Sequence, residues 1–380
     1  MKIVADDKIP FLKGVLESYA DVLYLPGNRI DRSAVSDADA LLIRTRTKCG
    51  ESLLKGTSVK FIGTATIGFD HIDIAYCNRK NIIWTNAPGC NSLSVQQYIT
   101  AALLKLESDN HFILKGKTLG IIGVGNVGSK VQKAAIAMGM KVLLNDPPRA
   151  RNEGKSGFVT LNTILHESDI ITLHVPLNIV CKDQTYHLFN DENFGKVRHG
   201  IWFINTSRGE VADTAALRRA LNSGKIAGAI LDVWENEPDI DTQLMSASFI
   251  ATPHIAGYST DGKANGTAMA VNTLSSIFGL PLRNWYPDNV PEPDSPDITI
   301  YCSGKSDSDL VREAVIHTYN INVDDTQLRR SPSDFENQRG DYRLRREFKA
   351  FTVKLIGGTE KVTMTLRELG FKLKLTNRLT

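Results

Sequence analysis

The sequence predicts an α/β protein built from parallel sheets and divided into more than one domain. Three observations lead to this fold class: short β-branched runs alternate with helical stretches, a Gly-x-Gly-x-x-Gly loop follows one of these runs, and the chain has 380 residues. The alternation favours parallel strands covered by helices. The length exceeds what one hydrophobic core usually organises.

The first ninety or so residues predict a parallel sheet of their own. Short apolar runs separated by helical stretches are found at Lys2–Ala5, Val22–Leu25, Ala40–Ile43, Val59–Gly63 and Ile82–Thr85. A helix is expected over residues 94–106, because apolar residues recur there at helical spacing.

The next part of the chain predicts a Rossmann-type doubly wound sheet. It opens with a strand and the glycine loop, and the helix after the loop extends to about Met138. The strands are expected at Thr118–Ile122, Lys141–Asn145, Ile170–His174, Ile201–Asn205, Ala229–Asp232 and Phe249–Ala251. Helical segments such as 214–221 separate them.

A third and smaller domain is expected near the C-terminus. A helical pattern of small residues over 260–278 stops at Gly279-Leu280-Pro281, where glycine and proline end a helix for backbone reasons. The stretch from Pro287 to Pro296 has the composition of a linker. The third domain should therefore begin near Ile298.

Composition excludes several classes of function. A formal net charge of +3 provides no general attraction for nucleic acid or an anionic membrane. No apolar stretch approaches the roughly 20 residues that a membrane-spanning helix needs. The five cysteines include no Cys-x-x-Cys pair and no metal-ligand spacing. We therefore expect a cytoplasmic protein with reduced thiols, and with no metal, nucleic-acid or membrane partner.

The loop Gly123-Val124-Gly125-Asn126-Val127-Gly128 predicts a dinucleotide site, because it follows an apolar strand and opens a helix. Gly123 allows the tight turn, Gly125 lets the backbone approach a pyrophosphate, and Gly128 allows close helix packing. The helix N-terminus can then face the phosphates. Asn126 and Val127 are expected to contact the cofactor with the three glycines.

An acidic residue indicates which dinucleotide is bound. Asp146 ends the next predicted strand, roughly 20 residues beyond the loop, where a carboxylate can accept hydrogen bonds from a ribose diol. The same carboxylate would repel the 2′-phosphate of NADP, although Arg149 and Arg151 nearby could accommodate it. NAD is the expected cofactor.

Three polar residues follow strands of the same predicted sheet: Arg208, Glu237 and His254. Ligands of open α/β sheets bind at the carboxyl ends of the strands, so these side chains should converge. Oxidation of a secondary alcohol requires a base for the hydroxyl proton, and histidine titrates near working pH. Glu237 would orient His254, and the planar fork of Arg208 suits a substrate carboxylate or carbonyl oxygen.

Three sequence blocks carry a resemblance to a known family. They are Thr206-Ser207-Arg208-Gly209, Leu231-Asp232-Val233-Trp234-Glu235-Asn236-Glu237-Pro238 and Thr252-Pro253-His254-Ile255-Ala256-Gly257. In their order and spacing the chain resembles the D-2-hydroxyacid dehydrogenases. The resemblance implies that His254 is the catalytic acid and base, supported by Arg208 and Glu237.

The resemblance also implies further cofactor contacts and a domain arrangement. Thr206, Asp232 and Gly257 are expected beside NAD, as is Val175, which stands where a hydroxyl-bearing residue is typical. A discontinuous substrate or lid domain of flavodoxin-like α/β fold would comprise residues 1–95 and 258–285. The NAD-binding domain would comprise 96–257, and an α+β C-terminal segment, 286–380, would form a homodimer.

The expected substrate carries an anionic group. Arg44-Thr45-Arg46-Thr47-Lys48 follows a predicted strand with three cations and two hydroxyls, a composition suited to a phosphorylated hydroxyacid. Arg44 and Arg46 are expected at the substrate from their charge. The resemblance implies that Thr45, Thr66 and Tyr258 also contact it.

Alternative functions stay open at this point. The substrate could be 3-phosphoglycerate or another D-2-hydroxyacid, and a NAD-sensing protein of the corepressor type would keep similar residues. The C-terminal basic residues have no interleaved aromatic platforms for nucleic acid. We expect solvated or subunit-interface charge for Arg329, Arg330, Arg339, Arg343, Arg345, Arg346 and Lys349.

Overall fold

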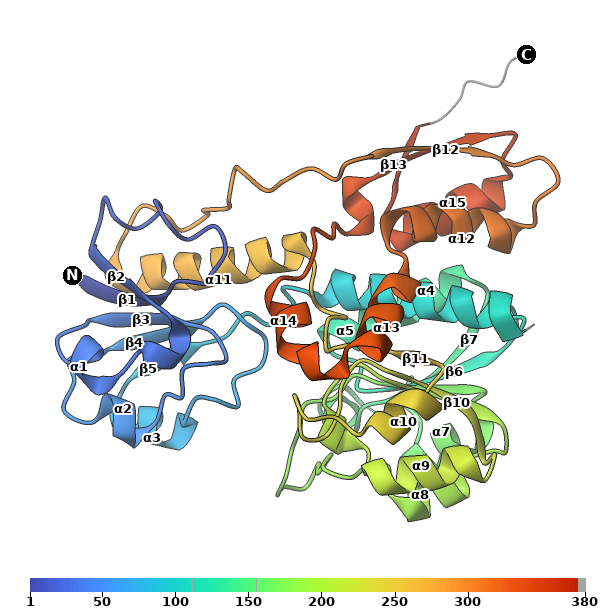
Figure 1. Cartoon of the computed structure of the whole chain (residues 1–380), viewed down its shortest axis with the longest axis horizontal. Helices are drawn as coiled ribbons and strands as arrows, with labels where there is room; N and C mark the ends of the chain where they lie inside the picture. Colours follow the sequence, from blue (N-terminus) through green and yellow to red (C-terminus); the bar gives the residue numbers. More distant parts are fainter. Residues whose placement is uncertain (111, 155, 375–380) are drawn as a thin grey trace. The chain divides into compact units, whose positions relative to one another are not determined.

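The computed structural model describes residues 1–110, 112–154 and 156–374. It divides into two compact units (Figure 1). The first comprises residues 1–91 and 259–291, and the second comprises residues 92–258 and the C-terminal segment from 292 onward. The last six residues of the predicted segment 286–380 lie outside the described residues.

The first unit contains a five-stranded parallel sheet with the strand order β2-β1-β3-β4-β5. This order is the flavodoxin-like arrangement expected for the substrate domain. The strands are β1 (Lys2–Asp6), β2 (Asp21–Leu25), β3 (Ala40–Ile43), β4 (Phe61–Thr64) and β5 (Ile83–Thr85). The helices are α1 (Arg32–Val35), α2 (Glu51–Leu54), α3 (Ile74–Arg79) and α11 (Thr260–Phe278).

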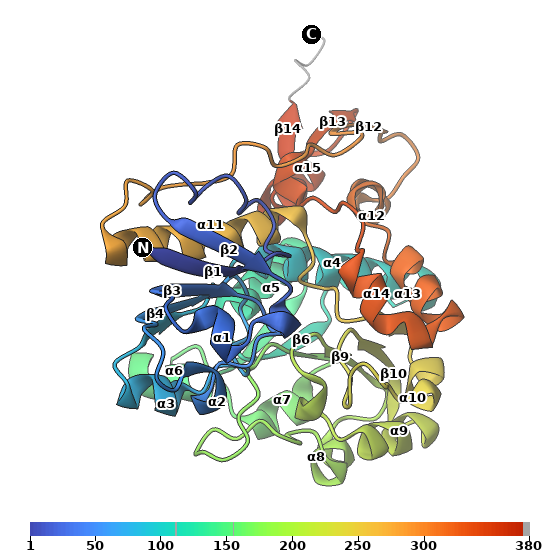
Figure 2. The ribbon, with the colours of Figure 1, turned by 60° about the vertical axis from the view of Figure 1, so that its left-hand side comes forward.

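Both faces of this sheet are covered, because side chains alternate along each strand. Val4 and Ile62 pack with α1, α2 and α3, whereas Ile3 and Phe61 pack with α11. Figure 2 shows α11 on one side of the sheet and α2 and α3 on the other. The returning helix therefore completes the N-terminal sheet.

The second unit contains a six-stranded parallel sheet with the order β11-β10-β9-β8-β6-β7. Its strands are β6 (Thr118–Ile122), β7 (Lys141–Asn145), β8 (Ile170–Leu173), β9 (Ile201–Asn205), β10 (Ile226–Leu231) and β11 (Ile250–Ala251). Its helices are α4 (Ser92–Asn110), α5 (Asn126–Ala137), α6 (Pro147–Glu153), α7 (Leu161–Glu167), α8 (Asp191–Lys196), α9 (Thr214–Asn222) and α10 (Thr242–Ala247). The order reverses between β6 and β8, so the Rossmann prediction is confirmed and the cofactor site is expected at that point.

The C-terminal segment forms a three-stranded parallel sheet with the order β12-β13-β14. Its strands are β12 (Asp297–Tyr301), β13 (Thr352–Ile356) and β14 (Lys372–Lys374). Its helices are α12 (Asp307–Thr318), α13 (Ile321–Arg330), α14 (Phe335–Gly340) and α15 (Glu360–Leu369). β12 begins one residue before Ile298, where the sequence predicts the third domain.

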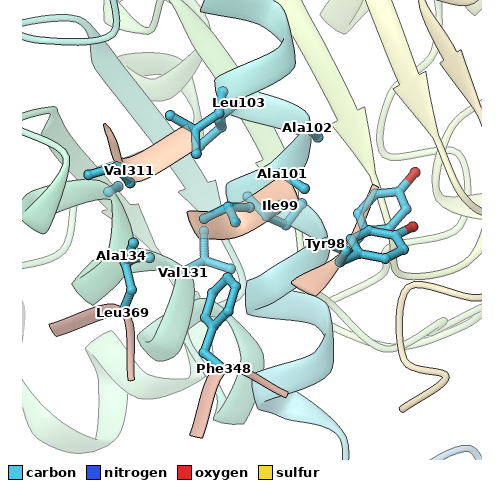
Figure 3. Close-up of a cluster of buried hydrophobic side chains, with 14 of the residues drawn as sticks. Tyr98, Ile99, Ala101, Ala102, Leu103, Val131, Ala134, Val311, Phe348 and Leu369 are labelled. Atoms are coloured by element: carbon cyan, nitrogen blue, oxygen red, sulfur yellow. The ribbon is translucent and has the colours of Figure 1, made fainter. Parts of the chain in front are cut away.

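One hydrophobic core joins the C-terminal segment to the helices α4 and α5. Leu103 and Val131 belong to the same buried cluster as Val311, Phe348 and Leu369 (Figure 3). α4 is consequently buried on more than one face and extends beyond the apolar repeat that predicted it. None of the described helices is long and apolar enough to cross a membrane.

Two basic residues of the C-terminal segment, Arg345 and Arg346, do not have the solvated or subunit-interface positions that the sequence predicts. Arg345 is 2% exposed rather than solvated. Its guanidinium donates to Ser94 O at 2.6 Å, Ile255 O at 3.2 Å and Gln97 Oε1 at 2.9 Å. Arg346 is also buried. The guanidinium of Arg345 thus donates to carbonyl and amide oxygens of the same unit, and these hydrogen bonds replace those it would make with water.

Candidate active site

The glycine loop has the geometry of a pyrophosphate cradle. Gly123 has a φ of +86°, and a Cβ there would lie 2.4 Å from His174 O. A Cβ at Gly128 would lie 2.0 Å from Gly123 O, whereas one at Gly125 would meet nothing within 4 Å. Gly125 is the N-cap of α5. Open space therefore adjoins the N-terminus of α5, as an incoming phosphate requires.

Asp146 joins the end of β7 to the glycine loop. Its carboxylate accepts from the amide of Val124 at 2.8 Å and from that of Arg149 at 3.0 Å. Arg149 is paired with Glu153, with Nε donating to Oε1 at 2.7 Å. A carboxylate beside the loop, with the neighbouring arginine already paired, favours NAD over NADP.

The second arginine of this region is also occupied. Arg151 donates from Nη1 to Asp183 Oδ1 at 2.9 Å. A ribose 2′-phosphate would have to displace that carboxylate before it gained the charge of Arg151.

Two more predicted cofactor residues follow the neighbouring strands β8 and β9. Val175 follows β8, and its side chain lies against the glycine loop, because a Cβ on Gly123 would lie 2.8 Å from Val175 Cγ1. Thr206 follows β9, and its hydroxyl lies 3.4 Å from His174 Nδ1. Burial lowers the pKa of His174 to about 3, so this histidine is neutral.

Glu237 and His254 come together, as their positions after β10 and β11 predict. His254 Nδ1 lies 2.7 Å from Glu237 Oε2, while the other carboxylate oxygen accepts from the amide of Trp234 at 3.0 Å. Burial alone would raise the pKa of Glu237. The charge and hydrogen bond of His254, the Trp234 amide and the charge of Arg339 outweigh burial and lower it. Glu237 is therefore a carboxylate, Nδ1 carries the proton, and Nε2 can accept one.

The backbone at His254 is unusual. Its φ is +56°, in the left-handed region that costs free energy for a residue with a Cβ. Asp232 fixes this loop: its carboxylate accepts from Thr252 Oγ1 at 2.6 Å and from the amides of Ile255 and Ala256 at 2.8 Å each. The predicted cofactor contact Asp232 thus has a second role, which is to hold the loop that carries the imidazole.

Arg208 lies in the turn after β9. Asn205 fixes that turn, because its amide donates to Arg208 O at 2.9 Å and its side-chain oxygen accepts from the amide of Ser207 at 3.0 Å. A Cβ on Gly209 would lie 1.9 Å from the carbonyl carbon of Trp234. The turn of Arg208 and the turn leading to Glu237 are therefore in direct backbone contact.

Tyr258 and Gly257 continue the His254 loop, and both are half-buried. The amide of Tyr258 donates to Ile255 O at 2.8 Å. Its ring packs edge-on against Tyr342, with centroids 5.9 Å apart. The guanidinium of Arg339 lies 5.7 Å from the centroid of the Tyr258 ring.

The other predicted substrate residues belong to the first unit. Arg44, Thr45 and Arg46 follow β3 directly, and Thr45 and Arg46 are exposed. Arg44 Nη1 donates to Lys8 O at 3.2 Å. Thr66 follows β4 and shares a hydrogen bond of 2.7 Å between its hydroxyl and that of Thr64.

Sequence reasoning missed a second cation beside Arg44. Lys263, in the first turn of α11, is half-buried, and both burial and the charge of Arg44 lower its pKa. The two cations come from segments more than 200 residues apart, and a single lysine in a helical pattern gives no indication of that approach. An anion bound between two cations would offset their mutual repulsion, so this pair favours the binding of an anion.

Within the part of the chain that the structure describes, no three His, Cys, Asp or Glu side chains gather as metal ligands would.

Family models cover two parts of the chain. The model for the NAD-binding domain of D-isomer specific 2-hydroxyacid dehydrogenases matches residues 94–256. A second model, described as a domain of unknown function, matches residues 290–370. The first match confirms the prediction of NAD as the cofactor.

Solved structures of this fold include a D-lactate dehydrogenase from Aquifex aeolicus, complexed with NAD and lactic acid. It is 29% identical, with a TM-score of 0.62, over 73% of this chain and 96% of that one. An NAD⁺-bound 3-phosphoglycerate dehydrogenase from Entamoeba histolytica is 27% identical, with a TM-score of 0.63, over 73% of this chain and 95% of that one.

Curated relatives extend over nearly the whole chain. Erythronate-4-phosphate dehydrogenase from Bacteroides thetaiotaomicron is 49% identical over 93% of this chain and 99% of its own length. The enzymes of the same name from Porphyromonas gingivalis and Yersinia pestis are 41% and 38% identical, over 98% and 99% of this chain and 100% of their own lengths. The chain therefore belongs to the erythronate-4-phosphate dehydrogenase family, with the NAD-binding domain of the D-isomer specific 2-hydroxyacid dehydrogenases.

Proposed function

We propose that the chain oxidises 4-phospho-D-erythronate to 2-oxo-3-hydroxy-4-phosphobutanoate with NAD, a step of vitamin B6 biosynthesis. Family membership over nearly the whole chain supports the reaction. The observation that carries the catalytic assignment is the hydrogen bond of 2.7 Å between His254 Nδ1 and Glu237 Oε2. It leaves Nε2 as the ring nitrogen available to the substrate hydroxyl.

His254 would act first as a base. Nε2 takes the proton of the substrate hydroxyl, and Glu237 stabilises the imidazolium that results. NAD, held by the glycine loop and Asp146, would supply the acceptor for the hydride on the carbon that carries this hydroxyl. Arg208 would bind the substrate carboxylate or the developing carbonyl oxygen through its planar fork. In the reverse direction His254 returns the proton.

The substrate phosphate needs cations, and the first unit supplies them. We propose that Arg44, Thr45, Arg46, Thr66 and Tyr258 contact the substrate. Arg44 and the half-buried Lys263 concentrate positive charge after β3, which suits a phosphorylated acid better than an unphosphorylated one.

The alternative substrates and the NAD-sensing function have less support. The neighbouring 3-phosphoglycerate dehydrogenase structure covers 73% of this chain, whereas the curated relatives cover 93% or more, including the C-terminal segment. The curated relatives that extend over nearly the whole chain are named as dehydrogenases, which supports an enzyme over a sensor with similar residues.

The test is an NADH absorbance assay with 4-phosphoerythronate, 3-phosphoglycerate and unphosphorylated 2-hydroxyacids. We expect the highest kcat/KM with 4-phosphoerythronate. A higher value with 3-phosphoglycerate would reassign the substrate, and no turnover of any compound would favour the sensor.

We also propose a cytoplasmic homodimer formed through the C-terminal segment. β12 alternates between exposed and buried residues, and its exposed face includes Tyr301, which is 68% exposed. An aromatic side chain on an open sheet face is a suitable contact for a second copy of the chain.

A further inference from the structure

Arg339, a residue of the C-terminal segment, lies over the ring of Tyr258, in the loop that carries the proposed catalytic residue His254. It is carried by α14, and its guanidinium lies 5.7 Å from the ring centroids of both Tyr258 and Phe335. Tyr258 follows His254 by four residues in the same loop. All of these residues belong to the second unit. The C-terminal segment therefore reaches the loop that carries the imidazole.

Arg339 is more enclosed than a solvated arginine. Its side chain is 19% exposed. Nη1 donates to Glu336 Oε1 at 3.2 Å, while Nε is buried and has no hydrogen-bond partner among the described residues. Burial of a cation is costly unless opposite charges lie near it. A surface arginine without a further role would more readily keep all its donors in water.

Glu237 provides such an opposite charge. The charge and hydrogen bond of His254 and the amide of Trp234 favour the carboxylate form of Glu237, and the charge of Arg339 adds to them. The elements around this carboxylate are thus the turn after β10, the loop after β11, and α14. On its other side, His254 faces the buried Asp232. Arg339 is the cation that the C-terminal segment contributes to this group.

We propose that Arg339 is a positioning residue of the dehydrogenase reaction, which holds the Tyr258 ring and the Glu237–His254 pair in their working arrangement. This inference rests on the proposed function. A cation near the pair favours its deprotonated state, in which Glu237 orients the imidazole and Nε2 is free to take the substrate proton. The C-terminal segment then serves catalysis directly, in addition to any role in assembly.

The test compares the full-length wild type with Arg339→Gln, Arg339→Met and Arg339→Lys. Arg330→Gln is the matched control, because Arg330 is an exposed arginine at the end of α13. We expect kcat for 4-phosphoerythronate to fall about tenfold in the Gln and Met variants. The acidic limb of their kcat/KM pH profile should move to higher pH, because the pair has lost a neighbouring cation. Lys should restore the limb, and Arg330→Gln should leave it in place.

The readouts separate positioning from simple stability. Melting temperature and NADH affinity are measured for each variant. Changes in either quantity should be too small to explain the shift of the acidic limb of the pH profile. An acidic limb that coincides with that of the wild type in both Gln and Met variants would overturn the inference, even if kcat fell. A wild type that does not oxidise 4-phosphoerythronate would instead overturn the proposed function, and this inference with it.

Discussion

At the scale of single residues, the chemistry depends on a carboxylate that stays ionised although it is half-buried. Glu237 accepts from His254 and from the amide of Trp234. The hydrogen bond to Glu237 sets the tautomer of His254, since a ring nitrogen that is hydrogen-bonded to a carboxylate must carry the proton. One hydrogen bond thus decides which ring nitrogen meets the substrate.

The pH dependence of stability follows from the same carboxylate. Its pKa is lowered from the usual 4.5 in the folded chain, so the interactions of its carboxylate form stabilise the fold above that value and are lost as pH falls through the folded pKa. Glu237→Gln removes this contribution. We expect the variant to melt at a lower temperature than the wild type at pH 7, with a difference that shrinks as pH falls below about 4.5. A difference that is constant with pH would contradict the assignment.

Arg208 tests the requirement for a planar fork. Lysine keeps the charge but has a single ammonium, so Arg208→Lys should lower kcat/KM by about 10- to 100-fold, the value of one or two charged hydrogen bonds. NAD affinity serves as the control, because it should stay within about twofold of the wild type. Unchanged catalytic efficiency would show that Arg208 acts only through its charge.

At the scale of elements, the catalytic loop is held from two sides. Asp232 binds the amides of Ile255 and Ala256 from the end of β10, and Arg345 binds Ile255 O from the C-terminal segment. His254, in this loop, has a left-handed backbone conformation, which persists only where the surrounding structure imposes it.

Arg345 should therefore be costly to replace. Arg345→Met leaves buried acceptors on Ser94, Gln97 and Ile255 without a donor, so we expect the free energy of unfolding to fall by about 3 kcal/mol. Arg330→Met, at an exposed position, should change it by less than about 0.5 kcal/mol. Equal effects of the two substitutions in denaturant titrations would mean that Arg345 contributes nothing specific.

The sequence predicts those features whose causes are local. The glycine loop and Asp146 could be identified because a tight turn, a helix start and a strand end each leave a mark within a few residues. Arg208, Glu237 and His254 could be placed because strand ends of a parallel sheet meet at one edge. The burial of Arg345 could not be predicted, because its acceptors on Ile255 and Ser94 are 90 and 251 positions away along the chain. The positions of Arg339 beside Tyr258 and of Lys263 near Arg44 could not be predicted for the same reason.

At the scale of the whole molecule, the C-terminal segment and the NAD-binding sheet form one unit. α4 and α5 share a core with α12, α15 and the strands β12 and β13. Removal of the segment would expose that core, so the loss of a dimer in a truncated chain could result from misfolding rather than from the loss of an interface.

A surface substitution is consequently the sharper test of the dimer. We expect sedimentation velocity to show a dimer for the wild type and a shift toward monomer for Tyr301→Glu, because a charge would replace an aromatic contact. Tyr19→Glu, at an exposed tyrosine of the first unit, is the control and should remain dimeric. A dimer that resists Tyr301→Glu would place the interface elsewhere.

The central claim is that this NAD-dependent dehydrogenase moves the substrate proton through His254. The most direct measurement is the rate of NADH formation from 4-phosphoerythronate by the wild type and by His254→Ala, with NADH binding followed in the same samples. The loss should be at least about 10²- to 10⁴-fold in kcat, the usual contribution of an acid–base group, with NADH affinity nearly unchanged. Near-normal turnover in His254→Ala would contradict the claim.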